Sequence, residues 1–240
     1  MNKKILIFGG TGAIGFSIAE KMSLEGYSPV IISRNEEELI NKSKKINCEY
    51  EVCDVLENNQ IIKVSEKHND AVFGVAYCIG SINLKPLKIS KDNDFVESFK
   101  INALGAINVI KSNIDSLTKN NGSILLFSTI AVQQGFTNHS VVSTSKGAIE
   151  GLTLSLAAEF APKIRVNCIA PSLTDSKMSQ KMISNDNIRK AIENMHPIPK
   201  IGKGEDFADL SSFLLGKKNN WITGQIFHID GGRSTLRIRA

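Results

Sequence analysis

The segment that decides the fold is Ile5-Leu6-Ile7-Phe8-Gly9-Gly10-Thr11-Gly12-Ala13-Ile14-Gly15, a short apolar run followed at once by a cluster of glycines. Gly9 permits a tight turn, Gly12 with Ala13 leaves room for a pyrophosphate, and Gly15 lets a following helix pack closely on a sheet. The N-terminus of that helix would face the phosphates with its positive end. A glycine cluster can also be a flexible turn, but its place between a first strand and a first helix favours nucleotide binding.

Further apolar runs of strand length follow at residues 29–32, 49–53, 71–77, 123–127, 165–169 and 225–229. Near-continuous apolarity is typical of strands in a parallel sheet that is covered on both faces. Amphipathic stretches alternate with these runs, with one face formed by Ile14, Ile18, Ala19 and Met22 and another by Ala148, Leu152, Ser155, Leu156 and Glu159. The alternation predicts one α/β domain over residues 1–240: a Rossmann-type, doubly wound, mainly parallel seven-stranded sheet with helices on both faces.

The bulk composition argues against several classes of protein. Hydrophobic residues make up 42% and charged residues 22% of the chain, which is an ordinary globular balance. A net charge of +5 is too mild to indicate a nucleic-acid or membrane partner, and no apolar stretch approaches the length of a membrane span. The four cysteines form no C-x-x-C pair, and the apolar run after the basic opening is too short for a signal peptide. We therefore expect a soluble, cytoplasmic protein without a metal site.

The residues after the second apolar run bear on the choice between NAD and NADP. An acidic side chain there would hold the ribose hydroxyls of the adenosine, but the chain has Ser33-Arg34-Asn35. A neutral serine followed by a cation suits a 2′-phosphate. The sequence therefore predicts NADP(H), although Arg34 could also be a solvated residue at the start of a helix.

Several other motifs accompany the glycine loop. Cys53-Asp54-Val55 stands at the end of the run at 49–53, and Asn102 stands in an Ile-Asn-Ala segment. Ser145-Lys146-Gly147-Ala148 leads to Ile164-Arg165-Val166-Asn167, and a last motif runs from residue 222 to 232. With these motifs the whole chain resembles the short-chain dehydrogenase/reductase family. Two motifs differ from the family pattern: Tyr77-Cys78-Ile79-Gly80 stands in place of Asn-Asn-Ala-Gly, and Pro171-Ser172 in place of Pro-Gly.

The resemblance implies an oxidoreductase that acts on a small-molecule substrate and assembles as a homodimer or homotetramer. Together with the glycine loop, it predicts cofactor contacts from Gly9, Thr11, Gly12, Ile14, Ser33, Arg34, Asn35, Asp54, Val55, Cys78, Ile79, Gly80, Lys146, Pro171, Leu173 and Thr174. It also implies that the segment from residue 173 to about residue 199 covers the nicotinamide. Nothing in that segment identifies the substrate.

The catalytic pattern of the family is incomplete in this chain. The family uses a tyrosine four residues before a lysine as the proton donor, and a serine thirteen residues before the tyrosine to orient the carbonyl. Lys146 matches the lysine and Asn102 the active-site asparagine, but the tyrosine position is Val142 and the serine position is Thr129. A positioned general acid supplies about 10²–10⁴ in rate, so its loss weakens catalysis without abolishing it.

His139 is a candidate replacement for the proton donor. It lies seven residues before Lys146, which corresponds to two helical turns and the same face as Val142. Enoyl reductases related to the family carry a tyrosine at this spacing, and histidine donates protons near neutral pH. The alternative is a polar loop residue that faces solvent or caps the helix.

Two functions from different classes remain open. The first is an NADP(H)-dependent oxidoreductase with altered proton transfer, which the retention of Lys146, Thr129 and Asn102 favours. The second is a catalytically silent NADP(H)-binding sensor or partner subunit, which Val142 favours. Nucleic-acid binding through the arginines of the tail is a weaker reading, because they lack interleaved aromatic residues: Arg233, Arg237 and Arg239.

Overall fold

The computed structural model describes residues 3–180 and 182–237. Within them the strands are β1 (Lys4–Phe8), β2 (Ser28–Ser33), β3 (Glu49–Val52), β4 (Val72–Tyr77), β5 (Ser123–Phe127), β6 (Arg165–Pro171) and β7 (Ile226–Ile229). They form one seven-stranded sheet in the order β3-β2-β1-β4-β5-β6-β7, with every neighbouring pair parallel. The predicted doubly wound sheet is therefore confirmed, and within the described residues it is wholly rather than mainly parallel.

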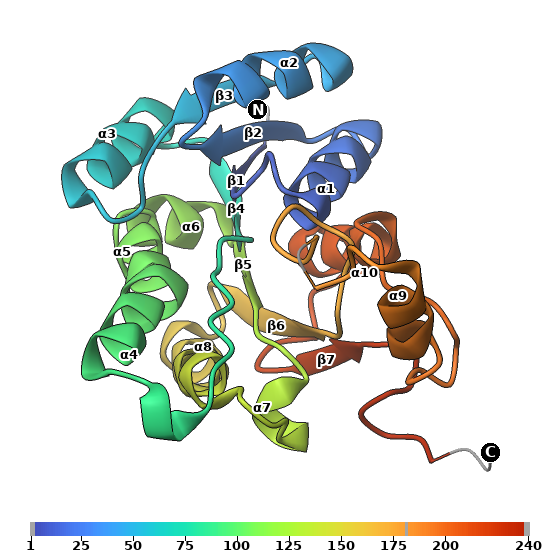
Figure 1. Cartoon of the computed structure of the whole chain (residues 1–240). Helices are drawn as coiled ribbons and strands as arrows, with labels where there is room; N and C mark the ends of the chain where they lie inside the picture. Colours follow the sequence, from blue (N-terminus) through green and yellow to red (C-terminus); the bar gives the residue numbers. More distant parts are fainter. Residues whose placement is uncertain (1–2, 181, 238–240) are drawn as a thin grey trace.

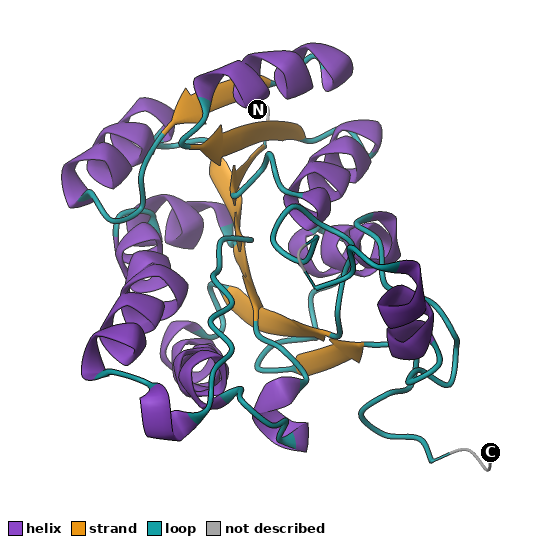
Figure 2. Ribbon diagram, in the orientation of Figure 1, coloured by secondary structure: helices purple, strands orange, loops and turns teal. Residues whose placement is uncertain are grey.

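The helices of this part of the chain are α1 (Ala13–Leu24), α2 (Glu36–Ile46), α3 (Asn58–His68), α4 (Asp92–Phe99), α5 (Gly105–Lys111), α6 (Ile114–Asn120), α7 (Ala131–Gln134), α8 (Ser140–Phe160), α9 (Asp186–Glu193) and α10 (Glu205–Leu215). A 3₁₀ turn lies at Leu87–Ile89, and a π-helical turn at Lys100–Leu104 joins α4 to α5. Figure 1 shows α1 and α10 on one side of the sheet and α3, α5, α6 and α8 on the other, and Figure 2 shows the sheet between these two layers. No helix within the described ranges combines the length and apolarity needed to cross a bilayer.

The core lies in two layers, one on each face of the sheet. Alternate side chains of a strand point to opposite faces, so Ile5 and Ile7 of β1 join the cluster under α1 and α10, whereas Leu6 and Phe8 join the cluster under α5 and α8. The four β1 side chains are fully buried. The central strands therefore show the near-continuous apolarity that a sheet covered on both faces requires.

The two edge strands do not follow that pattern. In β3, Glu49 and Val52 are exposed, and the residues of β7 are only half-buried. The expectation that every strand would be buried on both faces is wrong at these edges, because an edge strand has a neighbour on one side only. β3 also ends at Val52, one residue earlier than the run predicted at 49–53.

The buried face of α8 differs from the predicted one. Ser155 and Glu159 are exposed, and the other predicted members of that face are half-buried. The buried face carries polar side chains whose hydrogen bonds are made inside the protein: Lys146, Glu150 and Thr153. Apolar residues alone therefore identified an adjacent flank of the helix instead of its most buried face.

Candidate active site

The glycine loop and β4 meet where the strand order changes direction, between β1 and β4. Such a switch point is where open α/β sheets bind ligands. Gly9 has φ of +83°, and a Cβ there would lie 2.9 Å from the carbonyl carbon of Cys78. A Cβ on Gly15 would lie 2.4 Å from the Gly9 oxygen. Close backbone packing thus requires both glycines. The N-terminus of α1 follows directly at the carboxyl end of β1.

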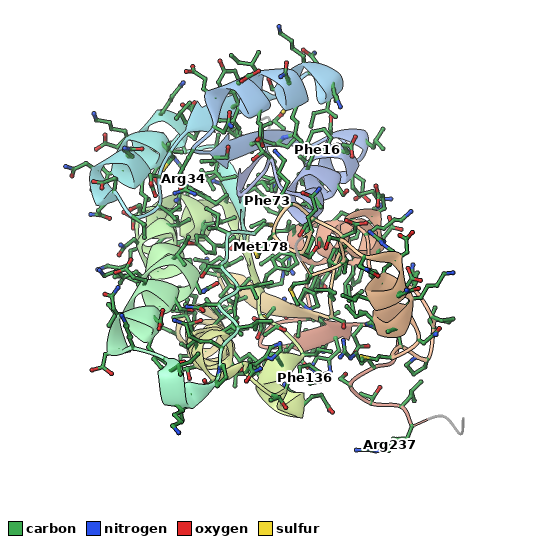
Figure 3. All side chains as sticks on the ribbon, viewed as in Figure 1. Phe16, Arg34, Phe73, Phe136, Met178 and Arg237 are labelled. Carbon is green, nitrogen blue, oxygen red and sulfur yellow. The ribbon has the colours of Figure 1, made fainter. Side chains whose placement is uncertain are left out.

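A cavity of about 730 Å³ opens beside this loop. Its lining includes many of the residues predicted to contact a cofactor: Gly9, Thr11, Ser33, Arg34, Asn35, Asp54, Val55 and Ile79. The Arg34 side chain is 68% exposed, and its Nη1 lies 3.6 Å from Asp54 Oδ2. Figure 3 shows Arg34 and Phe136 far apart in this view, with Met178 of the segment after β6 between them.

Asn35 shapes the rim of this cavity by starting α2. Its Oδ1 accepts a hydrogen bond from the Glu38 backbone N–H at 3.1 Å, and the backbone N–H of Asn35 donates to Ser33 Oγ at 3.3 Å. An asparagine N-cap satisfies a backbone donor that the first helical turn would otherwise leave unpaired. The cap therefore fixes the backbone that presents Arg34 at the end of β2.

The remaining predicted cofactor residues lie on both sides of the switch point. Gly12 and Ile14 are at the start of α1, and Cys78 donates its backbone N–H to the Phe8 oxygen at 2.8 Å. Pro171 ends β6, and its oxygen accepts from the Ile130 amide at 3.1 Å. Beyond β6, the oxygen of Leu173 accepts from the Gly202 amide, and Thr174 forms a bridge to Gly202. The segment after β6 is not a continuous loop, because it contains α9.

Lys146, Asn102 and Gly80 form the centre of the site. A Cβ on Gly80 would lie 3.0 Å from Asn102 Oδ1 and 3.2 Å from Lys146 Nζ, so only a glycine leaves both side chains in place. The Lys146 ammonium is buried and donates to the Phe127 oxygen at 2.8 Å. Burial lowers its pKa to about 8, and an ammonium has three N–H donors, which leaves capacity for a ligand.

Asn102 lies in the π-helical turn between α4 and α5. Its Nδ2 donates to the Ser98 oxygen at 2.9 Å, and its Oδ1 accepts from the Ser81 amide at 3.1 Å. Tyr77 supports the turn by donating to the Ile101 oxygen at 2.6 Å. π-Helical turns are frequent at functional sites, and here the turn directs a buried amide toward the segment that follows β4.

The hydroxyls after β5 have different environments. Ser128 donates to Glu150 Oε1 at 2.7 Å and is buried, so it faces the interior. Thr129 Oγ1 accepts from the Ala131 amide at 3.3 Å, which leaves its own O–H available. Of these neighbours, Thr129 is therefore the one that can bind a substrate oxygen. The side chain of Val142 is buried and provides neither a donor nor an acceptor.

His139 is the N-cap residue of α8, which begins at Ser140, and it has φ of −100° and ψ of 6°. Its oxygen accepts a helical hydrogen bond from the Ser143 amide at 2.8 Å, and the chain from Ser140 to Lys146 is helical. The side chain of His139 makes no capping hydrogen bond, and its role as proton donor stays a prediction. The His139 Nδ1 lies 2.8 Å from the Thr137 oxygen, and the ring packs edge-on against Phe136 at 5.4 Å.

Two polar groups of this region were not found from the sequence. Glu150 is a buried carboxylate bound by Ser128 and Gln133. His196, from the segment after α9, lies 2.8 Å from Ser172 Oγ and is also buried. Glu150 could have been found from its spacing of one turn from Lys146, whereas nothing in the sequence connects His196 with Ser172. Within the described residues, His, Cys, Asp and Glu side chains form no group that could hold a metal ion.

Comparison with known proteins gives consistent results. The family model described as Enoyl-(Acyl carrier protein) reductase matches residues 10–234. A 3-oxoacyl-[acyl-carrier-protein] reductase from Rickettsia conorii is 31% identical over 235 residues, covering 96% of each chain. Carbonyl reductase family member 4 from Danio rerio is 28% identical and covers 98% of this chain and 100% of its own. The NADP-bound structure of ElxO has a TM-score of 0.91 at 28% identity, over 98% of this chain and 100% of that one. The chain therefore belongs to the short-chain dehydrogenase/reductase family of oxidoreductases.

Proposed function

We propose that the protein is an NADP(H)-dependent oxidoreductase in which proton transfer differs from the usual pattern of its family. The observation that carries the proposal is the buried Lys146 ammonium, which lies beside Gly80 and Asn102 while the residue one helical turn before it is Val142. The cofactor, when bound, exchanges a hydride with the substrate. Lys146 and Asn102 would position the nicotinamide end, and Thr129 would orient a substrate oxygen.

The choice of NADP(H) rests on the cavity beside the glycine loop. Arg34 supplies a cation at its rim, and Ser33 leaves the position of the usual acidic residue neutral. A guanidinium with five N–H donors can bind a 2′-phosphate even while it contacts Asp54 at 3.6 Å. The NADP-bound state of the related ElxO structure supports the same choice.

The proton donor that we propose is His139. Its Nδ1 faces a carbonyl oxygen, which only accepts, so Nδ1 carries a hydrogen. In the imidazolium form Nε2 carries a second hydrogen, which it would donate to a substrate oxygen, leaving the ring neutral. We expect His139→Ala to lower kcat by about 10²–10⁴ and to leave NADPH affinity nearly unchanged. His139→Gln keeps a polar side chain and serves as the matched variant. An unchanged kcat in His139→Ala would favour a water molecule held by Thr129 and Lys146.

The test of the function combines binding with a substrate screen. NADPH titration should show tight binding, and oxidation of NADPH should occur with a member of a carbonyl, enoyl or imine panel. Binding without turnover across all panels would favour the catalytically silent sensor or partner subunit, for which the apolar Val142 argues. Failure to bind either NADPH or NADH would contradict both functions.

A homodimer or homotetramer is expected, and light scattering would distinguish them.

A further inference from the structure

Arg233 is a half-buried arginine in the turn that follows β7. Its Nη1 lies 3.5 Å from Ser172 Oγ and its Nη2 lies 3.5 Å from Met195 Sδ. The guanidinium stands over the Phe136 ring, 4.8 Å from the ring centre. Within residues 3–180 and 182–237, no carboxylate oxygen lies within 4.0 Å of it.

Other arginines of the described chain have stronger acceptors. Arg189 pairs with Asp175 at 2.9 Å, and Arg165 donates to the Leu214 oxygen at 2.7 Å. For Arg233 the two contacts are long, so at least three of its five N–H donors lack a close acceptor among the described residues. Burial also lowers the pKa of the Arg233 guanidinium. Removing a cation from water without pairing it is costly, which favours a role in binding an anion.

The acidic residue closest in sequence, Asp230, accepts two backbone hydrogen bonds from the same turn. Asp230 accepts from the Gly232 amide at 2.9 Å with Oδ1 and from the Ser234 amide at 2.8 Å with Oδ2. This arrangement fixes the turn that carries Arg233. The charge of Asp230 raises the pKa of the guanidinium, but burial lowers it more, and among the described residues no ion pair joins the two side chains. The turn therefore presents a cation that its neighbouring carboxylate does not contact directly.

The guanidinium is also held in place by its neighbours. Ser172 Oγ lies 2.8 Å from His196 Nε2, and His196 Nδ1 lies 2.8 Å from the Ile192 oxygen. Since a carbonyl oxygen only accepts, Nδ1 carries the hydrogen, and in the neutral ring Nε2 accepts from the Ser172 hydroxyl. Ser172 then offers its lone pairs to Arg233. The Phe136 ring and the Ser172 hydroxyl together orient the guanidinium before any ligand arrives.

The surroundings of Arg233 belong to the substrate side of the site. Ser172 directly follows Pro171, whose oxygen accepts from the Ile130 amide beside Thr129. Phe136 comes from the segment between α7 and α8, and Gln134 of α7 donates to the Ser234 oxygen. Figure 1 shows α7 close to β7 at the sheet edge where the strands β5 and β6 also end. Arg233 thus follows the carboxyl end of β7, and its contacts Ser172 and Phe136 follow the carboxyl ends of β6 and β5.

We propose that Arg233 binds a carboxylate of the substrate, so that the protein acts on carbonyl compounds that also carry an acid group. A planar carboxylate matches two N–H donors of a guanidinium, which a neutral ester or amide does not. This inference rests on the proposed oxidoreductase function, because the ligand would be the compound that Thr129 and the cofactor act on. It concerns the substrate class and uses none of the residues that hold the cofactor.

The test compares matched substrates in matched variants. Pyruvate and levulinate are each paired with their methyl esters, and NADPH oxidation is followed in the unmutated protein and in Arg233→Gln, Arg233→Lys and Arg237→Gln. Arg237 is the control because it is exposed four residues later, on the tail that Figure 3 shows leading away from the body. We expect kcat/KM to favour the acids about 10- to 100-fold, Arg233→Gln to abolish the preference, Arg233→Lys to keep part of it, and Arg237→Gln to leave it unchanged.

A second readout does not require turnover. Calorimetry of pyruvate and levulinate binding to the NADP⁺ complex should show binding in the unmutated protein and its loss in Arg233→Gln, while NADPH titration confirms that the variant is folded. Turnover without acid preference would leave the oxidoreductase function standing and overturn the carboxylate site. Carboxylate binding without turnover would support the site and count against the catalytic function. Absence of both, or a preference that survives in Arg233→Gln, would overturn the inference.

Discussion

The glycine loop after β1 and the region around the start of α8 lie at the same edge of the sheet, but different forces fix them. At the loop, a Cβ on Gly15 would lie 2.4 Å from a backbone oxygen, so the backbone itself excludes other residues. Around α8, the positions are fixed by side chains, such as the Lys146 ammonium that donates to the Phe127 oxygen. Substitutions in the glycine loop would therefore disturb the backbone, whereas around α8 one side chain can replace another without moving the backbone.

This difference agrees with the proposal that proton transfer is altered through a side chain of α8. Position 142 is a side-chain position on a helix, and a valine there leaves the helix and the neighbouring Lys146 in place. An equivalent change in the glycine loop would displace the backbone of β1 and α1. The glycine loop should therefore follow its family closely. Side-chain positions, such as 142 and those of the motifs Tyr77-Cys78-Ile79-Gly80 and Pro171-Ser172, should carry what is particular to this protein.

Restoring a tyrosine at position 142 should have the largest effect. Val142→Tyr would place a phenol one helical turn before Lys146, and we expect a gain of about 10²–10⁴ in the reduction of a simple ketone, measured by NADPH absorbance. Val142→Phe adds similar volume without a hydroxyl and should show no gain, and NADPH titration checks that both variants fold. Ordinary ketone turnover in the unmutated protein, or equal rates in both variants, would mean that the missing hydroxyl at position 142 does not limit ketone reduction.

The glycine loop should be the region most sensitive to a single added methyl. Gly15→Ala would force a Cβ against the Gly9 oxygen, so we expect NADPH affinity to fall by about 100-fold or more, together with a lower Tm. Gly151→Ala is the matched control: in α8 a Cβ there meets nothing within 4 Å, and alanine should raise stability by about 0.5–1 kcal/mol. Calorimetry and thermal unfolding would measure both. Equal effects at the two glycines would contradict the proposed backbone constraint.

Lys146 should make the stability of the ligand-free protein depend on pH. Because burial lowers its pKa from 10.5 to about 8, the unfolded chain binds more protons than the folded chain between these values, and stability rises with pH across this window. Lys146→Met removes the buried charge. The stability of Lys146→Met relative to the unmutated protein should therefore fall by about 3 kcal/mol as the pH rises from 8 to 10.5, whatever its constant cost from the lost hydrogen bond to the Phe127 oxygen.

Urea unfolding at about pH 7 and about pH 10 measures this effect. Lys63→Met, at an exposed position of α3, is the control for removing a surface lysine. The variant and the unmutated protein share all other titrating groups, so the difference between them isolates Lys146. A constant difference at all pH values would contradict the expected effect of burial on Lys146.

The sequence predicts the fold well wherever one physical effect dominates. The buried central strands are apolar along their whole length, and the glycine cluster has a requirement that few other segments meet. The sequence predicts the structure less well where two effects compete. The edge strand β3 is half polar, and α8 buries Lys146 and Glu150 because hydrogen bonds satisfy them. Apolar periodicity cannot identify a buried polar face of this kind.

The candidate site divides in the same way. The positions of Gly80, Asn102 and Lys146 followed from motifs, and the structure brings them together. The cluster of Arg233, Ser172 and His196 comes from three segments far apart in the chain, so no local pattern predicts it. His139 lies at the N-cap of α8, and because spacing along the chain does not reveal which way a side chain points there, its role as proton donor stays a prediction.

The smallest expected effect concerns the choice between the two cofactors. Arg34 is largely exposed and lies 3.6 Å from Asp54, so water and this carboxylate both weaken its pull on a phosphate. We expect NADPH to bind at least about tenfold more tightly than NADH, which corresponds to about 1.4 kcal/mol, and Arg34→Ala to erase most of this difference. Lys45→Ala removes a cation from the far end of α2 and should leave the ratio unchanged. Equal affinities for the two cofactors in the unmutated protein, measured by calorimetry, would show that Ser33 and Arg34 do not bind the 2′-phosphate selectively. The end of β2 would then not select NADP(H) as its sequence predicts.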